Sequence, residues 1–79
     1  MSEAELARVT LGGLLYQLRE SAELTQEAVG KELWTSGTTV HRIEQGKSPI
    51  KGPQLETLLR LFDVNDEGLR QRLLRLAQR

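Results

Sequence analysis

The chain has 79 residues, no cysteine, one histidine and eleven residues of each charge, so its net charge is zero. A chain of this length forms one small domain, and without cysteine it has neither disulfide bridges nor thiolate metal sites. No apolar run approaches the ~20 residues of a membrane-spanning helix, and the N-terminus lacks the pattern of a secretion signal. We therefore expect a cytoplasmic protein, and the leucine-rich composition without period-two alternation predicts an all-α fold.

Residues 1–9 are polar and show no clear helix cap, so we expect a flexible N-terminal segment, with at most a short helical turn at residues 3–7, before a domain that spans residues 10–79. Thr10 is the expected cap of the first helix. Apolar residues recur along this helix at the spacing of one face, at Leu11, Leu14, Leu15, Leu18 and Ala22. The stripe predicts a helix that packs against the rest of the domain.

Two short helical patterns follow, separated by a three-residue break. Each begins at a capping residue, Thr25 for the first and Ser36 for the second, which spans residues 37–45. Each also carries two apolar residues on one face: Val29 with Leu33, and Val40 with Ile43. This layout is typical of a helix-turn-helix.

Two further helices complete the expected fold. Pro53 opens the fourth helix after a loop at residues 48–52, and Asn65 or Asp66 caps a fifth helix that runs to Gln78. Their inward residues are Leu55, Leu58, Leu59 and Phe62 in the fourth helix and Leu69, Leu73 and Leu76 in the fifth. Five helices with short connections predict a compact bundle.

The helix-turn-helix segment carries two runs of residues that point to a family. Thr25-Gln26-Glu27 opens its first helix, and Arg42-Ile43-Glu44-Gln45-Gly46 closes its second. These runs resemble the DNA-binding domains of phage repressors and Cro proteins, also called xenobiotic-response-element-like regulators. Residues 11–77 are also similar to the N-terminal domains of actinobacterial regulators, which usually continue into a C-terminal domain. The resemblance implies a bacterial transcriptional regulator that binds double-stranded DNA sequence-specifically and is associated with the nucleoid.

The resemblance also implies the roles of individual residues, with the helix at residues 37–45 inserted into the major groove. Groove-facing residues are Gly37, Thr38, His41 and Arg42. Candidates for phosphate contacts are Thr25, Gln26, Ser36, Lys47 and Lys51. From charge alone, the basic residues after the helix fit an ordinary solvated loop equally well. Gly37 stands where repressors often carry a long side chain that reads a base.

The matching Arg and Glu of related domains form a partly buried ion pair, which implies that Arg19 and Glu44 tie the first helix to the end of the third. The alternative is two solvated charges worth ~0–1 kcal/mol. Gly30 falls where the family places a small residue at the crossing of its two motif helices, and glycine is expected to permit the same approach as alanine.

Trp34 departs from the family pattern, which has glycine at this position. The chain leaves the helix there through a left-handed conformation that costs other residues about 1–2 kcal/mol. Either the turn is reshaped or the Trp34 ring recovers this energy by packing. We expect the ring to pack on the motif helices, where it would fill the space left by the polar Thr35.

Catalysis finds no support in the sequence. Gly46-Lys47-Ser48 is similar to a phosphate-binding loop, but His41 stands where that motif needs a glycine. His41 lacks a nucleophile and an orienting carboxylate in any recognisable arrangement. We expect no enzyme, no cofactor and no metal site.

Leucines cover a wide arc of the fifth helix, and Leu74 at its edge is expected to stay partly exposed. A homodimer or a C-terminal partner domain would cover it. A rival interpretation is a protein-interaction module of the same fold, which presents Trp34 and these leucines to a partner and binds DNA weakly or not at all.

Overall fold

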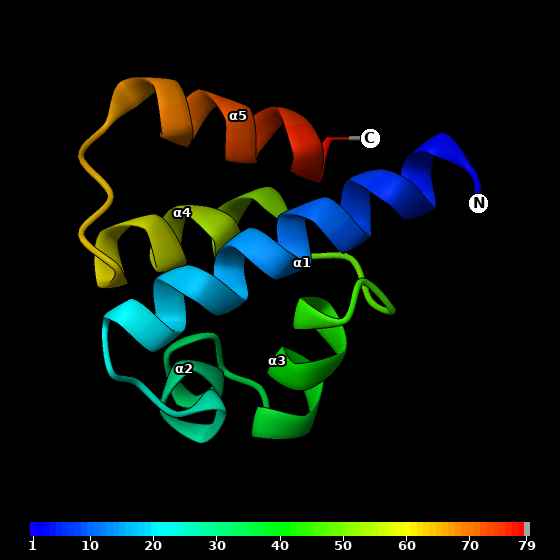
Figure 1. Ribbon diagram of the computed structural model, residues 1–79. Helices are drawn as coiled ribbons and strands as arrows, with labels where there is room; N and C mark the ends of the chain where they lie inside the picture. The colour runs from blue at the N-terminus through cyan, green and yellow to red at the C-terminus, as the bar shows by residue number, and fades with distance from the viewer. Residues whose placement is uncertain (79) are drawn as a thin grey trace.

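The computed structural model describes residues 1–78, which contain helices and no strand. The helices are α1 (Glu3–Ser21), α2 (Gln26–Glu32), α3 (Gly37–Glu44), α4 (Gly52–Leu61) and α5 (Glu67–Ala77). In Figure 1, α1 crosses the molecule with α2 and α3 below it and α5 above it. Helix α1 packs on both α3 and α5, and α2 packs on α3. The predicted all-α bundle of five helices is confirmed.

The first helix begins earlier than the sequence pattern suggests. It starts at Glu3, so the expected start at Thr10 is wrong, and the segment expected to be flexible forms two turns of α1. The reason is a capping box: Ser2 Oγ accepts from the backbone N–H of Glu5, whose carboxylate accepts from the backbone N–H of Ser2. Ala7 in this extension is buried.

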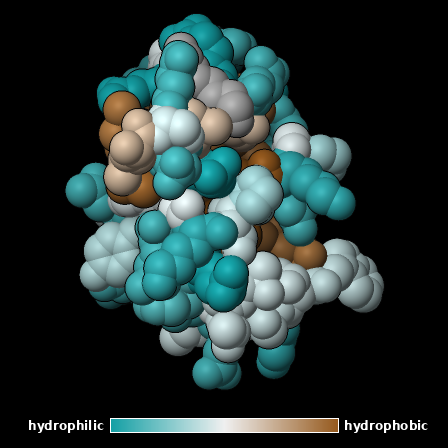
Figure 2. All heavy atoms as spheres, turned by 90° about the vertical axis from the view of Figure 1, so that its right-hand side faces the viewer, coloured by the Kyte–Doolittle hydropathy of each residue, from teal (hydrophilic) through white to brown (hydrophobic). Residues whose placement is uncertain are grey.

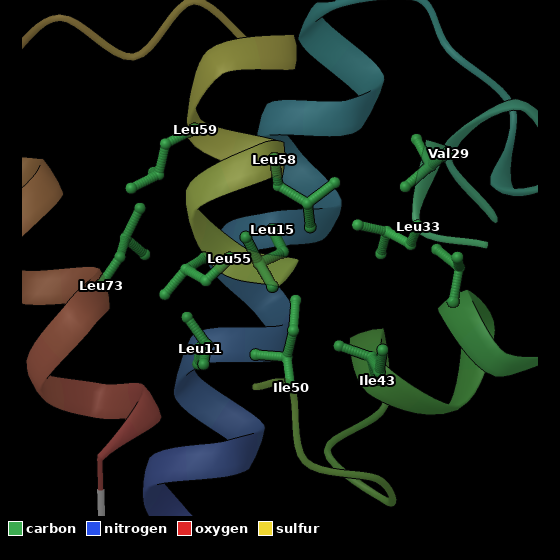
Figure 3. Close-up of a cluster of buried hydrophobic side chains, with 11 residues drawn as sticks. Leu11, Leu15, Val29, Leu33, Ile43, Ile50, Leu55, Leu58, Leu59 and Leu73 are labelled. Carbon is green, nitrogen blue, oxygen red and sulfur yellow. The ribbon is translucent and has the colours of Figure 1, made fainter. Parts of the chain in front are cut away.

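The core collects side chains from all the helices and from the loop before α4. Figure 3 shows Leu11 and Leu15 of α1 at its centre, between residues of the helix-turn-helix on one side and those of α4 and α5 on the other. The other buried residues are Val29, Leu33, Val40, Ile43, Ile50, Leu55, Leu58, Leu59 and Leu73. Ala22, expected to be inward, is exposed after the end of α1.

Four of the helices end in the same way. The residue after each C-cap adopts a left-handed backbone, with φ values of 57° at Glu23, 59° at Trp34, 77° at Gly46 and 55° at Asp63. In each case this residue and the next donate N–H groups back to the last turn, as in Trp34 to Lys31 and Thr35 to Gly30. Only α3 uses glycine, the residue that adopts this conformation without strain.

The surface is mixed in character. Figure 2 shows one face on which hydrophilic side chains are interrupted by patches of hydrophobic ones. Among the described residues, large apolar side chains are exposed at Met1, Leu6, Val9, Tyr16 and Trp34. No described helix combines the length and hydropathy needed to cross a membrane.

Candidate nucleic-acid interface

The helix-turn-helix is held by its caps and by close contacts at two glycines, Gly30 and Gly37. Thr25 Oγ1 accepts from the backbone N–H of Ala28 at 3.0 Å, and Ser36 Oγ accepts from that of Thr39 at 3.2 Å. A Cβ atom on Gly30 would lie 2.7 Å from the backbone carbon of Ser36. Gly30 therefore permits the expected close approach of the two helices, and the approach is closer than alanine would allow, because the backbone before α3 occupies the space of a Cβ atom.

Gly37 meets α2 in a similar way. A Cβ atom there would lie 2.9 Å from Cγ of Glu27 and 3.1 Å from its backbone nitrogen. The missing side chain thus lets the first turn of α3 rest on the first turn of α2. Gly37 is half-buried and offers backbone rather than a reading side chain to a groove.

Thr38, His41 and Arg42 are exposed on α3, the helix predicted to enter the groove. An open groove of about 680 Å³ lies between the starts of α2 and α3 and is lined by Thr25, Gln26, Glu27, Gly37, Thr38 and His41. Arg42 lies toward the following loop, where its Nε donates to Ser48 Oγ at 3.2 Å. The remaining guanidinium donors of Arg42 are available to an acceptor from outside.

The residues expected at phosphates lie at the starts of α2 and α3 and in the loop that follows α3. Lys47 and Lys51 are exposed in the loop between α3 and α4. The hydroxyl oxygens of Thr25 and Ser36 accept from their own helices and fix the starts of α2 and α3. The amide nitrogen of Gln26 contacts Glu44 and His41, so it is not free to bind a phosphate.

Gln26 belongs to a network that joins α1, α2 and α3. Arg19 donates from Nε to Glu44 Oε2 at 2.6 Å and from its second terminal nitrogen to Oε1 at 3.2 Å. Gln26 donates to the same Oε1 at 2.9 Å, and Arg19 also reaches the carbonyl oxygen of Leu24 at 2.8 Å. The side chains of Arg19 and Glu44 are only 8% and 6% exposed. Hydrogen bonding to Glu44 raises the pKa of Arg19, so the guanidinium stays charged despite its burial.

Trp34 lies in the turn between α2 and α3 and is 96% exposed. The expectation that its ring packs on the motif helices is wrong, because the left-handed turn is kept and the side chain points into solvent. Leu74 is half-buried against the core on the other side of the molecule.

Two glycines have roles that the sequence analysis missed. A Cβ atom on Gly12 would lie 2.5 Å from the backbone oxygen atoms of Ile43 and Glu44, so α1 touches the end of α3 directly. At Gly46 a Cβ atom would lie 2.7 Å from a methyl group of Val9. The only local signal for the Gly12 contact was the glycine itself, which lies inside a leucine-rich helix although glycine has a low helix propensity.

Comparison with known proteins gives one result for the whole domain. The sequence model of a helix-turn-helix domain family matches residues 10–73, which include α2, α3, α4 and most of α1 and α5. No curated protein and no solved structure is similar enough to match. The match covers both helices of the groove, confirms the predicted helix-turn-helix domain and is compatible with the repressor and Cro type.

Proposed function

Because the chain belongs to the helix-turn-helix domain family, we propose that it is a bacterial transcriptional regulator that binds specific sequences of double-stranded DNA. In this proposal α3 enters the major groove and the protein acts by binding, without catalysis. The cytoplasm, in association with the nucleoid, is the proposed location.

The observation that carries the proposal is the exposed face of α3 beside the start of α2. Thr38, His41 and Arg42 share it, and no acidic residue lies in the first turn of α3. The Glu44 carboxylate on the same helix is neutralised by Arg19. The exposed carboxylate of Glu27 at the start of α2 also lines the groove, but α3 itself offers several donors and no free negative charge, which suits the edges of base pairs.

The flanking groups supply the sequence-independent part of the binding energy. Lys47 and Lys51 follow α3 in an exposed loop. Backbone N–H groups at the starts of α2 and α3 add hydrogen-bond donors. The positive end of each helix dipole lies there and favours a bound phosphate. Each lysine that neutralises a phosphate contributes about one unit to the dependence of affinity on salt concentration.

A single domain of this size is expected to bury only about 600–1,000 Å² on DNA, so we propose that it works in pairs. The α5 face around Leu74 is the proposed contact, with either a second copy or a C-terminal domain as its partner. Sedimentation of the native chain and of Leu74→Lys, with and without DNA, tests this. A strict monomer that binds one half-site as tightly as a palindrome would contradict it.

Titration of random duplex DNA at several salt concentrations, followed by sequencing of the retained molecules, tests the DNA proposal. Enrichment of a discrete motif supports it. Retention that is uniform across sequences and disappears with salt would exclude sequence-specific recognition.

A protein-interaction module is the second candidate, favoured by the exposure of Trp34. Because Trp34 is the only tryptophan, its fluorescence reports on any partner that covers it. A blue shift on adding a protein partner, with none on adding DNA, would favour this second function.

A further inference from the structure

In its contact with His41, the side-chain amide nitrogen of Gln26 acts as a hydrogen-bond donor. This nitrogen lies 2.9 Å from Glu44 Oε1 and 3.1 Å from His41 Nδ1. An amide NH₂ group has two hydrogens and accepts nothing, so one hydrogen goes to each partner. Nδ1 of His41 is therefore the acceptor in this contact.

This contact selects one tautomer of the imidazole. A neutral histidine that accepts at Nδ1 carries its proton on Nε2. Among residues 1–78, Nε2 of His41 has no hydrogen-bond partner, and the side chain is exposed in the groove between α2 and α3. The free polar group that His41 presents is thus a hydrogen-bond donor.

Position 37 explains why this donor has access to a base. His41 follows Gly37 by four residues and shares its helical face. Side chains on a helix lean toward its N-terminus, so the imidazole extends toward Gly37. Because Gly37 has no side chain, α3 itself places nothing there between the imidazole and a base edge; the side chain that packs against Gly37 is that of Glu27 from α2.

We propose that His41 is the specificity-determining residue and that it reads guanine, with Gln26 as the positioning residue that holds its tautomer. The proposal rests on the proposed DNA-binding function. Guanine presents two neighbouring acceptors, N7 and O6, in the major groove. Adenine places an amino donor beside its N7, which disfavours an N–H group approaching the same site.

The tautomer is measurable without DNA. His41 is the only histidine, so its two ring nitrogens give unambiguous signals in a long-range ¹H–¹⁵N correlation spectrum. At about pH 8.5, well above the ordinary histidine pKa, the wild-type chain should show the proton on Nε2. Gln26→Ala should give averaged shifts of mixed tautomers. A proton on Nδ1 in the wild-type chain would overturn the proposal whatever the DNA results.

The base assignment is tested by selection from random duplexes with the wild-type chain, His41→Ala, Gln26→Ala and Lys51→Ala as a phosphate-contact control. His41→Ala should lower affinity for the selected site about 10-fold to 100-fold and remove the preference at one guanine per half-site. Gln26→Ala should weaken the preference at the same position. Lys51→Ala should weaken all sequences equally.

Replacing that guanine by 7-deazaguanine, which lacks the N7 acceptor, completes a double-mutant cycle. It should weaken wild-type binding and leave His41→Ala unaffected. Unchanged base preference in His41→Ala, or a uniform loss over all sequences in Gln26→Ala, would overturn the proposal while leaving DNA binding intact. If the wild-type chain enriches no motif, the proposed function and the guanine assignment both fail.

Discussion

Gly12 of α1 lies directly against the backbone carbonyl of Glu44 at the end of α3, at a distance where a Cβ atom would be 2.5 Å from the carbonyl oxygen. The Glu44 carboxylate is bound by Arg19, seven residues further along α1. Helix α1 therefore holds both the backbone and the side chain of this one residue of α3.

The Gly12 contact predicts opposite effects for two neighbouring substitutions. Gly12→Ala should lower the free energy of unfolding by about 1–3 kcal/mol, because the new methyl group meets backbone atoms that cannot move independently. Gly13→Ala is the matched control, since a Cβ atom at Gly13 meets nothing within 4 Å. It should raise the free energy of unfolding by about 0.5–1 kcal/mol through helix propensity. Urea unfolding measures both, and equal effects would refute the contact.

The ion pair of Arg19 and Glu44 should be strongly coupled. Glu44→Ala leaves a buried guanidinium without its partner, with an expected loss of about 2–4 kcal/mol. A double-mutant cycle should then give a large coupling energy. The pair of Arg70 and Glu56, whose side chains are 32% and 37% exposed, is the control and should give about 0–1 kcal/mol. Additive losses for Arg19 and Glu44 would contradict this prediction.

Trp34→Gly should raise the free energy of unfolding by about 1 kcal/mol. Glycine relieves about 1–2 kcal/mol of left-handed strain, and its greater freedom in the unfolded chain returns about 0.4–1 kcal/mol. The exposed ring contributes no burial that is lost. Trp34→Ala, which keeps a Cβ atom, is the control and should change little. Thermal melts measure both variants, and the wild-type fluorescence should be that of a water-exposed indole.

Arg42 and Lys47 should affect DNA binding differently. Arg42→Ala should weaken binding to the preferred site by about 1–3 kcal/mol, whereas Lys47→Ala should weaken all sequences and flatten the salt dependence by about one unit. Both residues are exposed, so neither variant should change the melting temperature. The control is Arg72, which is exposed on α5, a helix that lies on the opposite side of α1 from α3 (Figure 1). Unchanged DNA affinity in Arg42→Ala would show that Arg42 is not part of the interface.

The first turn of α1 should fray in acid. Hydrogen bonds from Ser2 lower the pKa of Glu5 below its ordinary value. A lowered pKa in the folded state means that the capping interaction is fully present above the ordinary glutamate pKa and is lost as the pH falls through the lowered value. The protection of amides at residues 3–6, measured relative to their intrinsic exchange rates, should therefore fall below about pH 4, and Ser2→Ala should remove this fall. An unchanged pH profile in Ser2→Ala would show that another group is responsible.

Local patterns predicted most of the fold because the leucine spacing and the capping residues act within a few positions of one another. Thr25, Ser36 and Asp66 cap their helices as expected. The start of α1 was also signalled locally, by the spacing of Ser2 and Glu5, and the polar composition around them obscured it. The local sequence therefore contained the information needed to place the start of α1 at Glu3.

The candidate site was only partly predictable because several of its contacts join distant parts of the chain. Nothing near Gly37 in the sequence indicates that Glu27 lies against it, and nothing near Gln26 indicates that its amide bonds to His41. Trp34 was misjudged for a related reason. A large ring suggests burial, but a left-handed residue that ends a helix can point away from both helices.

The spacing of Gly12 and Arg19 also limits where the chain tolerates insertions and deletions. Seven residues are nearly two turns, so both positions lie on the same side of α1. One residue gained or lost between them would rotate Arg19 by about 100° away from Glu44 while Gly12 stayed in place. The length of residues 12–19 is therefore fixed, whereas the exposed Asn65 in the link between α4 and α5 has no such double attachment, so the chain can change in length there.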